Sequence, residues 1–140
     1  MKYLIHPEYE YLRPFVENLP DVFEKEGEVI YTGRNLIKVM QAGDLTVNVK
    51  RYRKPSFLNR LIYTFLRKPK GLRAFTYPEK LLYLGFETPQ PIAYIEDKQG
   101  GLIAYSYFVS IQSPYTQNFY QFGDTDVEDC CEVMTAFARY

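Results

Sequence analysis

A run of strictly alternating residues at positions 45–52, LTVNVKRY, constrains the fold more than any other feature of the sequence. Apolar side chains occur at every second position from Leu45 to Val49, which is typical of a strand with one buried side. The preceding residues 41–44, QAGD, are typical of a tight turn, because glycine tolerates a positive φ. The pattern therefore predicts an antiparallel strand that follows a hairpin turn and carries Lys50 on its polar side.

Other periodic segments indicate that strands and helices are mixed along the chain. Strand patterns occupy residues 28–40 (two runs around 32–35), 91–97 and 102–112, and helical patterns occupy residues 56–66, 72–84 and 127–140, with short helical turns across residues 9–23. Pro78 either kinks the second of these helices or begins a new one. The order of the segments predicts an α+β fold, in which helices cover one face of a five-stranded antiparallel sheet.

Charge is distributed unevenly, although the formal net charge is zero. Residues 45–78 contain nine Lys or Arg residues and no Asp or Glu, whereas residues 91–140 contain seven acidic residues against two basic ones. A hydrophobic fraction of 46% in 140 residues suffices for one domain, or for one lobe of a larger protein. Lys50, at the start of the basic region, is therefore either a solvated group or a ligand for a phosphate or carboxylate.

The scarcity of histidine and cysteine excludes several kinds of site. The sequence contains one histidine, His6, and two adjacent cysteines, Cys130 and Cys131. Adjacent cysteines rarely pair and no Cys/His set has metal-ligand spacing, so we expect no disulfide framework and no metal site. Residues 1–4 lack the apolar run of a signal peptide, and no segment has the roughly 20 apolar residues of a membrane span. We therefore expect a cytoplasmic protein in a reducing compartment.

The order of the elements resembles that of a protein-kinase N-terminal lobe: two strands, a third strand bearing a lysine, a helix, and a hairpin that leads to a linker. In detail the sequence resembles the bacterial lipopolysaccharide-core kinases, the Kdo and heptose kinase group. The resembling segments are YTGRNLIKV (31–39), VNVKRY (47–52), LNRLIYTFLRKPKGLRAF (58–75), LGFETPQPIAYIE (84–96) and SYFVS (106–110).

The resemblance implies a nucleotide-binding role for Lys50. It would be the lysine of the third strand, which binds the α- and β-phosphates of ATP and pairs with an acidic residue of the following helix. Counted from Gly85, the position of that acid is Thr76, and Glu79, one turn later, is the candidate partner. Asn48 would lie beneath the adenine.

The resemblance also assigns the loops around the nucleotide. Residues 32–35, with Gly33 and Arg34, would form a loop over the phosphates that has one glycine in place of the usual glycine-rich pattern. Residues 110–113, which include Ile111 and Ser113, would be the hinge whose backbone groups bind adenine.

The implied activity is ATP-dependent phosphorylation of a Kdo or heptose hydroxyl. Residues 1–112 would form the N-terminal lobe, and residues 113–140 would form the hinge and the first helix of a second lobe that is otherwise absent. The catalytic Asp and the metal-binding Asp of the family have no counterpart here. We therefore expect no catalytic residue in this chain, and Mg²⁺ would be held mainly by the missing lobe.

Basic residues in the region of the two central helices imply contact with phosphates. Four of them would face a phosphate-bearing glycolipid acceptor such as the lipopolysaccharide inner core, or anionic lipid at the inner membrane: Arg67, Lys68, Lys70 and Arg73. Aromatic residues near this run have core spacing, so we expect no nucleic-acid partner.

Two other interpretations stay open at this point. The chain is alternatively a non-catalytic, degenerate lobe that binds a protein or an anionic surface, or a plain α+β domain without a ligand. The apolar stripe of residues 56–66 is expected to pack on the sheet, with a helix lying on a membrane as the alternative.

Overall fold

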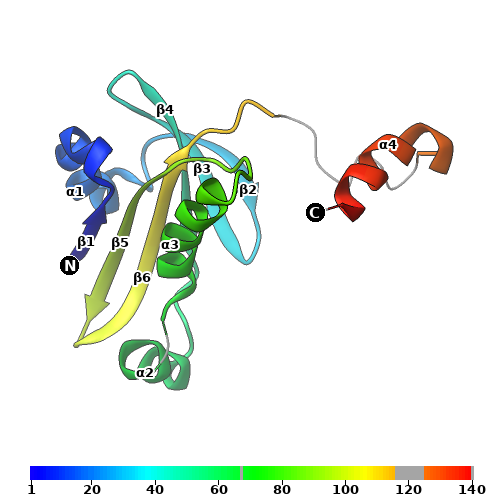
Figure 1. Ribbon diagram of the computed structural model, residues 1–140. Helices are drawn as coiled ribbons and strands as arrows, with labels where there is room; N and C mark the ends of the chain where they lie inside the picture. Colours follow the sequence, from blue (N-terminus) through cyan, green and yellow to red (C-terminus); the bar gives the residue numbers. More distant parts are fainter. Residues whose placement is uncertain (67, 116–124, 140) are drawn as a thin grey trace.

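Six antiparallel strands form one sheet in the order β1-β5-β6-β4-β3-β2 (Figure 1). The computed structural model describes residues 1–66, 68–115 and 125–139. The strands are β1 (Lys2–Ile5), β2 (Glu28–Thr32), β3 (Asn35–Ala42), β4 (Leu45–Tyr52), β5 (Pro91–Gln99) and β6 (Leu102–Ile111). The helices are the 3₁₀ helix η1 (Pro7–Leu12) and the α-helices α1 (Arg13–Val22), α2 (Phe57–Phe65), α3 (Lys70–Tyr83) and α4 (Val127–Ala138). The predicted α+β class is confirmed.

The predicted number of strands is wrong, because the sheet has six strands where the sequence predicted five. The missed strand, β1, contains four residues and pairs antiparallel with β5, with Leu4 opposite Tyr94. A strand this short carries little periodic signal, and its partner is distant in the sequence. The strand β4, by contrast, has the predicted bounds, and it lies between β3 and β6.

One face of the sheet is covered by α1 and forms the main core. Val16, Leu19 and Phe23 are fully buried there against Val47 and Val49 of β4. The apolar positions of the alternating run therefore face α1. Pro20 lies inside α1, so the short turns expected across residues 9–23 are one 3₁₀ helix followed by one α-helix.

The opposite face is partly covered by α3, which lies in front of β5 and β6 in Figure 1. Gly71 brings the first turn of α3 close to the aromatic rings of Tyr52 and Tyr94. Because Tyr52 and Val49 are three residues apart on β4, their side chains project from opposite faces. Helices thus lie on both faces, which corrects the expectation that they cover one face.

The helices differ in two ways from the sequence expectations. Pro78 lies inside a continuous α3, so it does not begin a new helix. The apolar stripe of α2 does not pack on the sheet, since Leu58 is 72% exposed and Leu66 is 84% exposed. Within the described parts of the chain, no helix is long and apolar enough to cross a membrane.

The strand β2 forms one edge of the sheet and is exposed along its whole length. It pairs with β3 alone, and the register shifts between Val29 and Tyr31. The turn between β2 and β3 lies beside the end of β4, because Asn35 is opposite Tyr52.

Candidate functional site

A row of side chains crosses the sheet on the face that carries α3. Tyr31 is opposite Ile37, Ile37 is opposite Lys50, Lys50 is opposite Phe108, and Phe108 is opposite Tyr94. Directly opposed residues in antiparallel strands project to the same side of the sheet. Lys50 therefore lies in the middle of this row, on the polar side of β4 that the alternation predicted.

The Lys50 side chain is half-buried and has no acidic partner. Its Nζ atom lies 5.5 Å from the centroid of the Tyr52 ring, in cation–π geometry. Among the residues that the structure describes, Lys50 forms no ion pair. A half-buried ammonium without a counter-ion is suited to bind an anion, because a ligand there would restore the charge balance.

A second strand lysine shows what a structural role looks like in this protein. Lys38 of β3 projects to the other face and is 5% exposed. Its Nζ donates to the carbonyl oxygens of Phe23, Glu24 and Glu26, at 2.6, 3.4 and 2.9 Å. Lys38 therefore holds the end of α1 to the sheet, whereas Lys50 has no comparable set of acceptors among the described residues.

The turn at residues 32–35 is the predicted phosphate loop. The N–H of Gly33 donates to the carbonyl oxygen of Asn35 at 3.1 Å. A Cβ atom at Gly33 would lie 2.6 Å from the hydroxyl oxygen of Tyr31. Gly33 has no positive φ, and Tyr31 is 52% exposed, so its ring would have to move to admit a side chain at this position.

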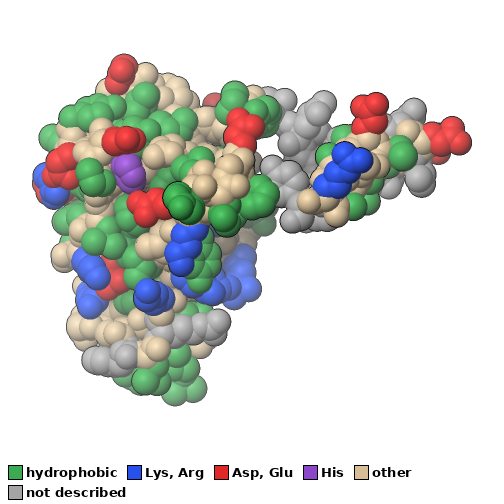
Figure 2. All heavy atoms as spheres, in the orientation of Figure 1, with side chains coloured by type: hydrophobic (Ala, Val, Ile, Leu, Met, Phe, Trp, Pro, Cys, Tyr) green, Lys and Arg blue, Asp and Glu red, His purple; other side chains and the backbone are tan. Residues whose placement is uncertain are grey.

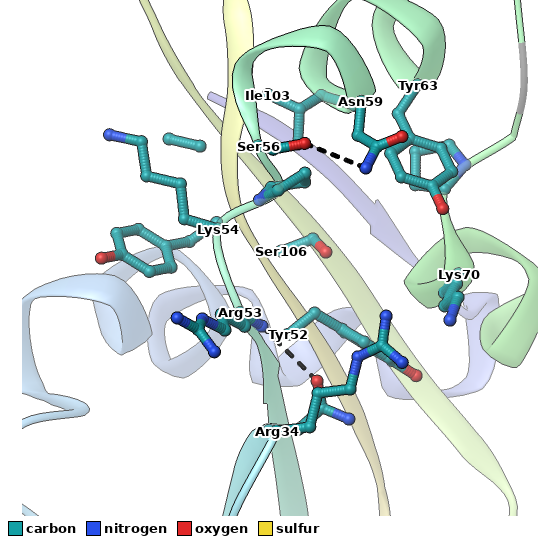
Figure 3. A pocket seen from close by; sticks show the side chains of 15 residues that line it. Arg34, Tyr52, Arg53, Lys54, Ser56, Asn59, Tyr63, Lys70, Ile103 and Ser106 are labelled. Carbon is teal, nitrogen blue, oxygen red and sulfur yellow. Dashed lines mark hydrogen bonds between the residues drawn. The ribbon is translucent and has the colours of Figure 1, made fainter.

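A cleft of about 800 Å³ opens beside this turn, at the end of β4 (Figure 3). The residues that line it come from the turn, the end of β4, α2, the start of α3, and β6: Arg34, Asn35, Tyr52, Arg53, Lys54, Pro55, Ser56, Asn59, Tyr63, Pro69, Lys70, Ile103, Ala104, Tyr105 and Ser106. Four of these are basic and the described lining contains no Asp or Glu. The cleft is therefore electropositive.

The basic side chains of the cleft are arranged in two groups. Figure 3 shows Arg34 and Lys70 turned toward the same part of the cleft, while Arg53 and Lys54 point away from Lys70. The Nζ of Lys54 donates to the side-chain oxygen of Gln99 at 3.0 Å. Arg34 and Lys70 are consequently the pair best placed to hold an anion that enters the cleft.

Tyr52 connects the cleft to Lys50. Burial raises the pKa of the Tyr52 phenol, while the nearby guanidinium of Arg73 lowers it by a smaller amount. The ring also contacts the first turn of α3 at Gly71. Arg73 Nε is buried and has no hydrogen-bond partner among the described atoms. Tyr52 thus lines the cleft with a phenol that burial keeps neutral, and the guanidinium of Arg73 is near that phenol.

Glu79, the candidate partner of Lys50, lies beside a different residue. Its Oε1 atom is 3.8 Å from Nε2 of His6, and its side chain is 53% exposed. Figure 2 shows the histidine, in purple, with acidic side chains near it. In the described chain no ion pair joins Glu79 to Lys50. Thr76, at the other candidate helix position, donates its hydroxyl to the carbonyl oxygen of Leu72 at 3.2 Å.

The predicted hinge at residues 110–113 overlaps the last two residues of β6, Ser110 and Ile111. The N–H groups of Ile111 and Gln112 donate to the carbonyl oxygens of Gln90 and Thr46, each at 3.0 Å. The N–H of Ser113 makes no hydrogen bond within the described residues. Ser113 therefore differs from Ile111 and Gln112, whose N–H groups have backbone acceptors.

The side chain of Asn48 is held by Gln112, which belongs to the segment predicted as the hinge. Its side-chain nitrogen donates to Oε1 of Gln112 at 2.9 Å, and the Gln112 amide donates in turn to the Ser113 carbonyl at 3.3 Å. This network fixes the polar surface next to the predicted adenine position. Gln112 was not singled out in the sequence, because its contact with Asn48 joins residues far apart in the chain.

The basic residues predicted to contact phosphates have different exposures. Lys68 and Lys70 are exposed, and Arg73 is partly buried. Arg67 lies outside the described residues. Figure 2 shows Lys and Arg side chains on the face that carries α3.

Sequence reasoning missed the cleft itself, although it identified Arg34 and Lys70. Tyr52 and Tyr63 line the cleft from β4 and α2, and neither was predicted to belong to a site. The signal that was available is the absence of acidic residues from all the segments that meet there. Comparison of the chain with models of protein families, with curated proteins and with solved structures finds no match.

Proposed function

We propose that the chain is the ATP-binding lobe of a sugar kinase similar to those that phosphorylate the lipopolysaccharide inner core. Lys50 binds the α- and β-phosphates, and the turn at residues 32–35 covers them. The observation that carries the proposal is the position of Lys50. Its side chain is half-buried on the face that α3 only partly covers, opposite Ile37, which lies two residues after the turn.

The pairing of the strands supports this proposal. Two antiparallel strands, β2 and β3, precede the lysine-bearing strand β4, helices follow it, and the hairpin of β5 and β6 returns to pair with β4. This is the element order of the resembling lobe, with β1 added at the edge. The return of β6 to β4 brings the hinge segment within reach of the same face as Lys50.

The adenine would lie against the apolar side chains of Ile37 and Val39. Both residues are half-buried on β3, and Val39 is directly opposite Asn48. The N–H of Ser113 would donate to the base, and the amide of Asn48 would border it. The hydrogen bond between Asn48 and Gln112 holds that border in a fixed orientation.

The chemistry would be transfer of the γ-phosphoryl group to a sugar hydroxyl. The bond between the β–γ bridging oxygen and the γ-phosphorus breaks, a bond from the sugar oxygen to that phosphorus forms, and ADP leaves. The hydroxyl proton passes to a base that belongs to a second lobe. In the described residues no group of three His, Cys, Asp or Glu side chains is placed to hold a metal ion. This chain therefore contributes positioning and charge, and Mg²⁺ enters with the nucleotide.

Titration with a non-hydrolysable ATP analogue and Mg²⁺, followed by NMR of the backbone amides, tests the proposal. We expect the shifts to concentrate at residues 33–35, Lys50 and Ser113. We expect Lys50→Ala to weaken binding by about tenfold or more, because a charge-assisted contact to phosphate is lost. The control Lys2→Ala removes an exposed strand lysine at the far edge of the sheet and leaves the affinity unchanged.

Two results would contradict the assignment. One is an affinity of the Lys50→Ala variant equal to that of the unmodified protein. The other is a set of shifts confined to regions away from the turn and the hinge. Circular dichroism of each variant shows whether the fold is retained, so that a loss of binding is not mistaken for unfolding.

A second candidate function is favoured by the position of Glu79. Because Glu79 lies beside His6, the Lys50 side chain lacks the acid that orients the lysine in an active kinase lobe. The chain would then be a non-catalytic lobe that binds a partner or an anionic surface. Absence of nucleotide-dependent shifts in a chain that circular dichroism shows to be folded would favour this second function.

A further inference from the structure

The helix α2 is attached to the protein by its polar side. Arg60 Nε donates to the carbonyl oxygen of Ile103 at 2.7 Å, and Arg60 Nη2 donates to the carbonyl oxygens of Leu102 and Gln99 at 3.2 and 2.9 Å. The N–H of Ile103 donates to Oγ1 of Thr64 at 3.3 Å. These bonds fix one side of α2 to the end of the β5–β6 hairpin.

The opposite side of α2 is apolar, and its described side chains are partly or largely exposed. Phe57 is 65% exposed, Leu58 72%, Leu61 37%, Ile62 40% and Leu66 84%. At 100° per residue these positions share one half of the helix, and Arg60 and Thr64 lie on the other half. The usual orientation of an amphipathic helix is thus inverted, since the polar half contacts protein and the apolar half contacts solvent.

Basic residues surround this apolar surface. Arg53 and Lys54 precede α2 and Lys68 follows it, and all three are exposed. Residues 45–78, which include both flanks of the helix, contain no Asp or Glu. An apolar helix face whose flanking segments carry basic and no acidic residues complements an anionic lipid bilayer, which is apolar inside and negatively charged at its surface.

We propose that α2 is a docking helix that lies in the interface of an anionic lipid membrane. Leu58, Ile62 and Leu66 enter the acyl region, while Lys54 and Lys68 contact the phosphates of the headgroups. With nine residues α2 is too short to span a bilayer, which takes about 20 residues, so the helix would lie in the plane of the membrane. The inference goes beyond nucleotide binding and does not depend on it, because the surface is separate from Lys50.

Sedimentation with vesicles tests the apolar part of the proposal. We expect the chain to bind vesicles of mixed phosphatidylcholine and phosphatidylglycerol. The affinity of the double variant Leu58→Gln, Leu66→Gln for these vesicles should be lower by about tenfold or more, because two apolar side chains are no longer removed from water on binding. The matched control is Tyr83→Gln, Leu84→Gln, which changes two side chains on α3 that are 91% and 66% exposed. It should bind as well as the unmodified chain.

Lipid composition and salt test the charged part. We expect binding to fall by about tenfold or more in the variant Lys54→Gln, Lys68→Gln, since each headgroup contact contributes about fivefold. Added salt should act in the same direction. The control Lys2→Gln, Lys25→Gln removes two exposed lysines outside residues 45–78 and should have little effect.

Three results would overturn the proposal. The first is equal binding to vesicles of phosphatidylcholine alone, and the second is undiminished binding of the Leu58→Gln, Leu66→Gln variant. The third is a dimer in light scattering that the same variant dissociates while the unmodified chain fails to bind vesicles. That result would identify a second copy of the chain as the occupant of the surface. Nucleotide titration of the variants separates this test from that of the proposed function.

Discussion

Tyr94 is fully buried at the centre of the sheet, and its environment opposes ionisation of the phenol. Burial is the larger cause and the nearby carboxylate of Glu96 the next, and together they raise the pKa well above its ordinary value of 10. The Tyr94 hydroxyl donates to Oε2 of Glu96 at 3.0 Å. The phenol is thus kept neutral in the folded protein, where it serves as a hydrogen-bond donor.

The raised pKa of Tyr94 predicts a loss of stability in alkaline solution. Above pH 10 the unfolded chain releases the phenolic proton while the folded chain retains it, so the free energy of unfolding falls as the pH rises. Below pH 10 this contribution is fully present. Urea denaturation on both sides of that pH should show the decrease, and Tyr94→Phe should reduce it. The assignment would be contradicted if the free energy of unfolding fell as much with pH in Tyr94→Phe as in the unmodified protein. It would also be contradicted if the exposed control Tyr83→Phe reduced that fall.

Gly71 allows α3 to approach the sheet. A Cβ atom there would lie 2.7 Å from a ring carbon of Tyr94 and 3.2 Å from a ring carbon of Tyr52. We expect Gly71→Ala to destabilise the fold by about 1–3 kcal/mol, because the rings must move. Alanine is intrinsically the better helix former, so propensity alone predicts the opposite sign. Chemical denaturation distinguishes the two, with the exposed helix substitution Lys80→Ala as the comparison.

At the level of elements, the attachment of α1 depends on a lysine in a neighbouring strand. Lys38 Nζ donates to three carbonyl oxygens at and after the end of α1, and it lies 5.1 Å from the centroid of the Phe23 ring. Arg51 adds an ion pair with Glu24 on the same side of the sheet. The bond from Lys38 gives a partner to the carbonyl of Phe23, the C-cap residue of α1, and the other contacts hold the segment that follows the helix.

Lys38→Met should destabilise the protein by about 2–3 kcal/mol, because buried carbonyl groups lose their donor. The thermal unfolding midpoint measures the effect, and Lys2→Met provides the control at an exposed strand position. A midpoint that falls no further in Lys38→Met than in Lys2→Met would show that solvent replaces the lysine without cost.

Elements determined by neighbouring residues in the sequence were predicted, and those determined by contacts with distant residues were not. The bounds of β4 were predicted because alternation and a preceding turn are local signals. The strand β1 was missed because its pairing with β5 is determined by residues far along the chain. The exposed side of α2 was also missed, since periodicity gives the composition of a helix face but not what the face contacts.

The same reasoning applies to the candidate site. Alternation placed Lys50 on the polar side of β4, and strand pairing then placed it opposite Ile37, two residues after the turn at residues 32–35. The partner of Glu79 was not predictable, because His6 reaches it from the first residues of the chain. The cleft likewise joins segments from residues 34 to 106, and only tertiary structure brings them together.

In the whole molecule the two faces of the sheet have different roles. The face beneath α1 contains the main core and the contacts of Lys38 and Arg51, which are structural. The other face is partly covered by α3 and carries Lys50 next to the electropositive cleft. The proposed ligand site thus lies on the side of the sheet opposite to the main core. The α3 face also contributes to stability, through the packing of Gly71 on Tyr94.

The exposed strand β2 has a consequence for the behaviour of the protein in solution. One row of its backbone groups faces water, and its side chains at Val29, Ile30 and Tyr31 are about half exposed. At high concentration such a border is a template on which a neighbouring molecule can continue the hydrogen-bonded ladder. The shift in register between Val29 and Tyr31 interrupts that template at its middle, which limits the growth of sheets from molecule to molecule.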